Sequence, residues 1–170
     1  MSKDEQGIFT DRYQVIPRVL VFILDGEKIL LLKGAPQKRL WANLYNGVGG
    51  HVEMGEDVYG AAIREIREET GLCVTRLKLC AITMIDAGKP VGINLYVFTA
   101  VYAGGDLVES DEGTLEWVYK DDLAQYNLVE DLPTLLPAIL ALSEKDEPLS
   151  ILYQYDEQDR LVITIHKTRS

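Results

Sequence analysis

The amino-acid sequence predicts a single α/β domain in which helices cover a mixed β-sheet. The chain has 170 residues, 47% of them hydrophobic, which is enough for one substantial core. Several short apolar runs between turn residues have the composition of strands, and two longer segments place apolar residues at helical spacing. The chain contains no internal repeat and no linker-like segment, so we expect one domain over residues 1–170.

The first predicted element is a β-hairpin over residues 15–32. Its two apolar arms flank an Asp-Gly pair at positions 25–26, which is favoured in tight turns. The loop that follows carries Lys33, Lys38 and Arg39. Basic side chains in such a loop either contact phosphate groups or are simply solvated.

The run from Gly50 to Leu72 predicts the first helix. Four apolar residues lie at the offsets i, i+3, i+4 and i+7 of one helical face: Tyr59, Ala62, Ile63 and Ile66. We expect this stripe to face the core. Gly71 follows the last charged turn and should end the helix.

The remaining elements alternate between strands and one further helix. Apolar runs predict strands near residues 73–84, 94–103 and 114–119. Helical spacing returns at residues 131–142, and two apolar arms around a polar turn predict a closing hairpin at about 148–167.

Three carboxylates cluster within the first predicted helix. Glu65, Glu68 and Glu69 stand at helical offsets of three and four, which places them on adjoining parts of one face. Like charges at these offsets cost an isolated helix roughly a few tenths of a kcal/mol per pair. A bound divalent cation would compensate this repulsion, although a solvated acidic face is the simpler reading. Arg64 lies four residues before Glu68 and can pair with it.

The cluster lies within a longer pattern, G-x5-E-x7-R-E-U-x-E-E-x-G-U, in which U is a bulky apolar residue. Every fixed position is occupied: Gly50, Glu56, Arg64, Glu65, Ile66, Glu68, Glu69, Gly71 and Leu72. This pattern is the signature of the Nudix hydrolases, which residues 50–72 therefore resemble. The resemblance implies a Nudix-type α/β/α sandwich with a central mixed β-sheet. It also implies an enzyme that hydrolyses a phosphoanhydride in a nucleoside diphosphate linked to a further group.

The resemblance also implies roles for individual residues. Mg²⁺ or Mn²⁺ is the expected cofactor, and five residues are its expected ligands: the Gly49 carbonyl, Glu65, Glu68, Glu69 and Glu112. Glu69 is the first choice for the general base and Glu65 the second. Arg64 belongs to the catalytic group as an organiser of the loop and helix, together with Glu56.

Segments outside the signature resemble the MutT-type branch, which includes oxidised-purine nucleoside triphosphatases such as those acting on 8-oxo-dGTP. Asn46 stands where that branch contacts the purine, and Glu112 stands five residues before Trp117, like a metal-binding Glu of the branch. The pair Glu130-Asp131 resembles an acidic pair that reads the purine edge. With Lys33, these residues form the predicted substrate contacts, and the expected products are a nucleoside monophosphate and pyrophosphate.

Each of these outer residues also has a structural reading. Asn46 precedes a glycine and is a common turn residue, and Asp131 can simply cap the helix that follows. Glu109 or Asp111 can take the place assigned to Glu112. Trp41 is as suited to packing as to stacking on a substrate.

Alternative functions share the same signature. Hydrolysis of ADP-ribose or another nucleotide sugar is the nearest alternative, followed by a non-catalytic nucleotide-sensing domain. An isomerase of isoprenoid diphosphates is disfavoured because the expected catalytic cysteine has no counterpart.

The composition limits the kinds of partner that we expect this protein to bind. A formal net charge of -10 argues against binding nucleic acid polymers, which requires a basic surface. The sequence has no apolar run long enough to span a bilayer and no signal-peptide pattern, so we expect no membrane contact and a cytoplasmic location. A small-molecule nucleotide is the expected partner, and the terminal hairpin leaves monomer and homodimer both open.

Overall fold

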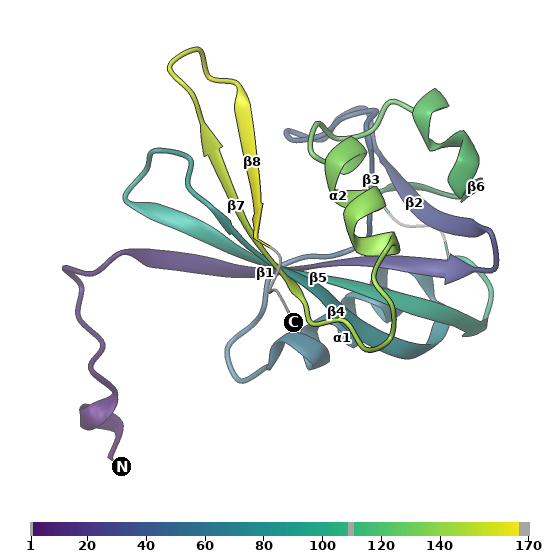
Figure 1. The fold of residues 1–170 in the computed structure, drawn as a ribbon. Coiled ribbons are helices and arrows are strands. Elements are labelled where there is room, and N and C mark those ends of the chain that lie inside the picture. The colour runs from purple at the N-terminus through teal and green to yellow at the C-terminus, as the bar shows by residue number, and fades with distance from the viewer. Residues whose placement is uncertain (1, 109–110, 167–170) are drawn as a thin grey trace.

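The computed structural model describes residues 2–108 and 111–166, and its ribbon is drawn in Figure 1. Within these residues, eight strands form one mixed sheet: β1 (Gln14–Asp25), β2 (Lys28–Gly34), β3 (Tyr45–Asn46), β4 (Cys73–Ile85), β5 (Val91–Gly104), β6 (Gly113–Tyr119), β7 (Leu149–Tyr155) and β8 (Leu161–His166). The strand order is β3-β2-β1-β5-β4-β7-β8, and β6 also pairs with β2. The pairs β1–β5 and β4–β7 are parallel and the others are antiparallel.

Two α-helices cover the sheet from opposite sides, as Figure 1 shows for α1 (Val58–Thr70) and α2 (Leu132–Leu140). Two short 3₁₀ helices, η1 (Lys3–Gln6) and η2 (Lys120–Gln125), complete the elements of the described residues. The predicted α/β fold with a mixed central sheet is therefore confirmed. The second helix is shorter than predicted, and the two-residue strand β3 and both 3₁₀ helices were not predicted.

Alternation along β1 creates a separate core on each face of the sheet. Val19, Val21 and Ile23 pack with residues of α1, whereas Leu20 and Phe22 pack with residues of α2. Successive side chains of a strand point to opposite faces, so one buried strand supplies both cores. The near-continuous apolar run of β1 is the sequence counterpart of this two-sided burial.

Strands β1 and β2 separate soon after the hairpin turn. Their register pairs run only from Asp25↔Lys28 to Ile23↔Leu30. Beyond this point the loop after β3 lies along β1, where the Val21 N–H donates to the Val48 carbonyl at 2.7 Å. The Val19 N–H donates in the same way to the Gly50 carbonyl at 2.9 Å. The glycine-rich loop is thereby held in the gap that the diverging strands leave open.

The buried face of α1 differs from the predicted stripe. Ala62 and Ile66 are buried as expected, but Tyr59 and Ile63 are 48% and 39% exposed. The prediction was wrong for these two residues because the helix is turned so that Glu65 faces the protein interior. A buried carboxylate needs partners, and those that Glu65 finds are described below.

Both ends of α1 are fixed by local interactions. The Asp57 side chain accepts a hydrogen bond from the Gly60 N–H at 2.8 Å, as an N-cap residue does. Gly71 ends the helix at φ 72°, as predicted, and its N–H donates to the Arg67 carbonyl. Within the described part of the chain, no helix is both long and apolar enough to cross a membrane.

Gly71→Ala should destabilise the fold more than Gly88→Ala, although both glycines have a similar positive φ. A side chain at such a φ costs about 1 kcal/mol or more at either position. At Gly71 the added Cβ also lies 2.7 Å from a methyl group of Val108, whereas at Gly88 it meets open space. We expect an additional loss of about 1 kcal/mol or more at Gly71, measured as the free energy of unfolding in urea. Equal losses for the two variants would contradict the tight packing at the end of α1.

Candidate active site

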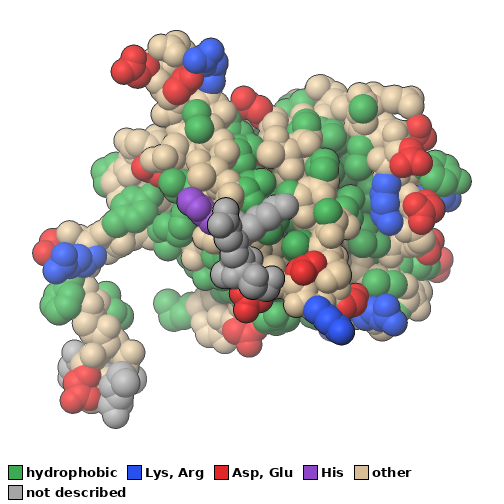
Figure 2. All heavy atoms as spheres, viewed as in Figure 1, with side chains coloured by type: hydrophobic (Ala, Val, Ile, Leu, Met, Phe, Trp, Pro, Cys, Tyr) green, Lys and Arg blue, Asp and Glu red, His purple; other side chains and the backbone are tan. Residues whose placement is uncertain are grey.

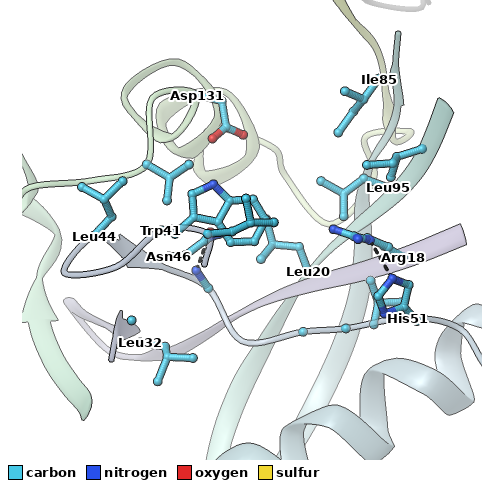
Figure 3. A pocket seen from close by; sticks show the side chains of 18 of the residues that line it. Arg18, Leu20, Leu32, Trp41, Leu44, Asn46, His51, Ile85, Leu95 and Asp131 are labelled. Carbon is cyan, nitrogen blue, oxygen red and sulfur yellow. Dashed lines mark hydrogen bonds between the residues drawn. The ribbon is translucent and has the colours of Figure 1, made fainter. Parts of the chain in front are cut away.

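A cavity of about 680 Å³ opens where β1 and β2 diverge. Carboxylates from α1 and the loop before β6 line one end, namely Glu65, Glu69 and Glu112. Figure 3 shows the other end, where Leu20, Trp41, Asn46 and Asp131 surround the same space at a distance from α1. One cavity therefore joins an acidic end to a largely apolar end.

Glu65 lies directly against the glycine loop. Its side chain is buried, with the whole residue only 9% exposed. A Cβ on Gly50 would come within 2.7 Å of the Glu65 carboxyl carbon, so a side chain there would displace this carboxylate from its present position. The glycine thereby lets the Glu65 carboxylate lie directly against the loop.

The Arg64 guanidinium joins the loop to the helix. Its Nε and Nη2 donate to the two carboxylate oxygens of Glu56 at 2.7 and 2.9 Å. Its Nη1 donates to Glu65 Oε1 at 2.8 Å and to Glu68 Oε2 at 3.1 Å, and Nη2 also donates to the His51 carbonyl at 3.0 Å. The predicted pairing with Glu68 is present, but the two-oxygen contact with Glu56 is the one that ties the loop down.

Arg64 and Glu56 each favour the charged form of the other. Hydrogen bonding to Arg64 lowers the pKa of Glu56 to about 2, helped by the Glu53 N–H, which donates to the same carboxylate at 3.0 Å. The same contacts raise the pKa of Arg64 above its usual value. Both groups therefore stay charged across the physiological pH range, and the loop between them stays fixed.

Glu69 is a carboxylate whose pKa the site raises to near neutrality. Its Oε2 accepts from the Gly49 N–H at 3.0 Å. Burial, together with the nearby negative charges of Glu65 and Glu112, raises the pKa of Glu69 to about 7 against the opposing effects of Gly49 and Lys38. A carboxylate with such a pKa is well suited to accept a proton at neutral pH.

The predicted metal ligands are only partly brought together. Glu65, Glu69 and Glu112 line the cavity with Gly49, but Glu112 is paired there with Lys38. Glu68 is 59% exposed in its side chain, pairs with Arg64 and does not line the cavity. Among residues 2–108 and 111–166, no three His, Cys, Asp or Glu side chains are placed closely enough to hold a metal ion. Glu109, the alternative to Glu112, lies outside the described residues, as does Lys167 at the end of the predicted hairpin.

The apolar end carries two oriented polar groups. Asn46 Oδ1 accepts from the Gly47 N–H at 2.8 Å, as the dashed line in Figure 3 shows. Asp131 precedes α2 but does not cap it with its side chain. Instead its Oδ2 accepts from the Tyr153 hydroxyl at 3.0 Å. Burial raises the pKa of Asp131, while the bond from Tyr153 opposes that shift.

The remaining predicted contacts are divided between cavity and surface. Glu130 is exposed and lines the cavity beside Asp131. Lys33 does not line it and lies at a separate, smaller hollow, with its Nζ 5.6 Å from the centre of the Tyr45 ring. Lys38 and Trp41 of the same loop do line the cavity.

Among the cavity residues that the sequence did not single out for this site are Arg18, His51 and Tyr153. Arg18 of β1 contacts His51 of the glycine-rich loop, and Tyr153 comes from the terminal hairpin. Arg18 had one recognisable signal, a charge inside an otherwise apolar strand. Tyr153 had none, because its partner Asp131 lies 22 residues away in the sequence.

Comparison with known proteins agrees with this geometry. The family model described as the NUDIX domain matches residues 15–139. Oxidized purine nucleoside triphosphate hydrolase of Mus musculus is 32% identical over 122 residues, which cover 71% of this chain and 77% of that protein. An NAD-capped RNA hydrolase, NudC of Pectobacterium atrosepticum, is 32% identical over 120 residues, covering 68% of this chain but only 44% of that protein.

Solved structures show the same fold. The crystal structure of a MutT protein from Bacillus halodurans matches with a TM-score of 0.72 and 25% identity, covering 88% of this chain and 97% of that one. The family model spans more than half of the chain and includes the whole of the loop, helix and carboxylates described above. The chain therefore belongs to the Nudix hydrolase family, as an enzyme of that family.

Proposed function

We propose that this protein hydrolyses purine nucleoside triphosphates to the monophosphate and pyrophosphate with the help of Mg²⁺ or Mn²⁺, and that oxidised purines such as 8-oxo-dGTP are its favoured substrates. The observation that carries the proposal is the single cavity described above. Its acidic end suits a metal-bound phosphate chain, and its apolar end, with Asn46 and Asp131, suits a purine. The name of the mouse relative, an oxidized purine nucleoside triphosphate hydrolase, supports the same substrate class.

The carboxylates at the acidic end fit a divalent cation. Carboxylate and carbonyl oxygens are the ligands that Mg²⁺ prefers. The mutual repulsion that helps to raise the pKa of Glu69 would be relieved by a positive charge between Glu69 and Glu65. These two residues and the Gly49 carbonyl would hold the ion, joined by Glu68 and Glu112 when they release Arg64 and Lys38. When bound, such an ion neutralises phosphate charge and lowers the pKa of a bound water.

Glu69 is our candidate for the proton acceptor, with Glu65 as the second choice. The Gly49 N–H orients one carboxylate oxygen of Glu69 and leaves the other free of this bond. The raised pKa makes the ionised form a stronger base than an ordinary glutamate. Arg64 and Glu56 act as positioning residues, because their contacts fix the loop and the helix that carry these carboxylates.

The polar groups at the apolar end suit the edge of a guanine-type base. Because the Asn46 oxygen accepts from Gly47, its NH₂ group is left to donate to a carbonyl of the base. Asp131 and the neighbouring Glu130 offer carboxylate oxygens to the base N–H groups. Trp41, which lines the same end, offers an aromatic face.

The face drawn in Figure 2 favours a small ligand over a nucleic acid polymer. On the face shown in Figure 2, Lys and Arg side chains form small separate groups among scattered acidic ones. A nucleic acid polymer would require a continuous basic surface to offset the net charge of -10.

The substrate proposal is tested by turnover of a nucleotide panel with Mg²⁺. We expect 8-oxo-dGTP to be hydrolysed with the highest kcat/KM, yielding pyrophosphate, and EDTA to abolish turnover. ADP-ribose, NAD and canonical dNTPs serve as competing substrates. A preference for ADP-ribose of about a hundredfold would overturn the purine triphosphate assignment, and no turnover of any compound would overturn the reaction.

Glu69→Gln should lower kcat by about two orders of magnitude or more, because the amide neither accepts the proton nor holds a cation as a carboxylate does. Glu157→Gln, in the exposed turn of the terminal hairpin, makes the same chemical change away from the cavity and should leave kcat unchanged. The measurement is steady-state hydrolysis with saturating Mg²⁺. A loss of less than about threefold for Glu69→Gln would remove this residue from the reaction.

The pKa of Glu69 predicts a pH-dependent stability in the metal-free protein. The pKa is about 7 in the folded state against 4.5 for a free side chain, so the folded state holds more protons between these values. The free energy of unfolding should therefore fall as pH rises through this window, by up to about 3 kcal/mol. Glu69→Gln removes this loss, so its stability relative to the wild type should grow with pH. Urea unfolding in EDTA measures the difference, and parallel pH profiles for the two proteins would contradict a raised pKa.

A further inference from the structure

Arg18 presents a guanidinium to the cavity from β1. It lies two residues before Leu20, so both side chains point to the same face of the strand, and its register partner on β5 is Leu95. All three residues line the cavity. Figure 3 shows the Arg18 side chain directed into the space between Leu20, Leu95 and His51.

Among the described residues, one side-chain hydrogen bond holds this guanidinium in place. Arg18 Nε donates to His51 Nε2 at 3.1 Å, and the two residues also form an isolated backbone bridge between β1 and the loop. Because the bond to His51 uses only the Nε–H, the two terminal NH₂ groups of Arg18 keep their donors. Together these two groups form a planar, bidentate pair of donors that matches two oxygens of a phosphate.

The charge of Arg18 is left without a carboxylate partner. Among the described residues, the ion pairs of the cavity and its rim are those of Lys38 with Glu112 and of Arg64 with the signature glutamates, and none involves Arg18. An arginine without an ion pair in a cavity that carries several carboxylates is suited to an incoming anion. The alternative is that Arg18 binds no ligand and only reduces the negative electrostatic potential of the cavity.

His51 places this guanidinium close to the expected phosphate chain. In the sequence, His51 comes directly after Gly49 and Gly50, which contact Glu69 and Glu65. Arg18 therefore lines the cavity beside the loop that contacts these carboxylates, which form the end proposed for the phosphates.

We propose that Arg18 is a substrate-binding residue that contacts a phosphate of the bound nucleotide, and that His51 is the positioning residue that orients it. The proposal rests on the proposed function for the identity of the ligand. It assigns affinity for the phosphates to a residue outside the signature.

Binding without turnover tests this role. The α,β-methylene analogue of GTP, GMP and deoxyguanosine are titrated into the Mg²⁺-loaded protein, and the Trp41 indole N–H is followed by NMR, a method that tolerates weak binding. Arg18→Ala should raise the Kd for the analogue about tenfold or more and leave the Kd for deoxyguanosine within about twofold. Arg18→Lys should give an intermediate Kd, because lysine keeps the positive charge but lacks the planar pair of donors. His51→Ala should weaken binding of the analogue less than Arg18→Ala.

Arg12→Ala is the matched control, because it removes the same charge from an exposed position outside the cavity. Weaker GMP binding by Arg18→Ala would assign the contact to the α-phosphate, and a loss confined to the analogue would assign it to the β- or γ-phosphate. An equal loss for deoxyguanosine, or a change of less than about twofold for the analogue in both Arg18 variants, would overturn the proposal. Binding is measured apart from catalysis, so a protein that binds the analogue through Arg18 but hydrolyses no nucleotide would contradict only the proposed function.

Discussion

The acidic end of the cavity depends on the contacts of one guanidinium. Arg64 bonds to Glu56, Glu65 and Glu68 and to the His51 carbonyl, so one cation compensates three carboxylates and ties a loop to a helix. Without it, Glu65 would be a buried charge with no compensating partner, which is among the costliest arrangements in a protein interior. The loop would also lose its two-oxygen anchor at Glu56. The carboxylates can therefore gather at this end of the cavity because an arginine balances part of their charge.

The cavity also requires space between the strands, and the sheet itself provides this space. Strands β1 and β2 pair only near their turn, and the glycine loop fills part of the gap that follows. One stretch of β1 consequently serves two purposes. Val19 and Val21 pack against α1, while Arg18 and Leu20, which alternate with them in the sequence, face the cavity. The core on the opposite face of β1 thus fixes the strand that carries these two cavity residues.

Local patterns predicted much of this structure, and contacts between distant segments account for what they missed. The first hairpin, helix α1 and its end at Gly71, and the closing hairpin were recognisable because their signals lie within a few residues. The rotation of α1 about its axis was not recognisable from the sequence. The burial of Glu65 depends on its contacts with Gly50 and Arg64 rather than on the spacing of apolar residues. The bonds from Arg18 to His51 and from Tyr153 to Asp131 span 33 and 22 residues, and no periodicity within one element encodes them. Glu68 and Glu112 matched a pattern, but each pairs with a cationic neighbour, and Glu68 does not line the cavity.

Tyr153, which supports Asp131 from the terminal hairpin, has a consequence for how such a protein can change during evolution. Tyr153, Tyr155 and Leu161 all line the cavity, yet they follow residue 139, where the match to the family model ends. The carboxylates and the loop that holds them lie entirely within that match. Substitutions in the last two strands can therefore reshape one wall of the cavity without touching the carboxylates or the loop that holds them. Asn46, Trp41 and Asp131 lie within the matched segment, so a lineage can alter the wall around Tyr153 while it keeps both the acidic end and these residues.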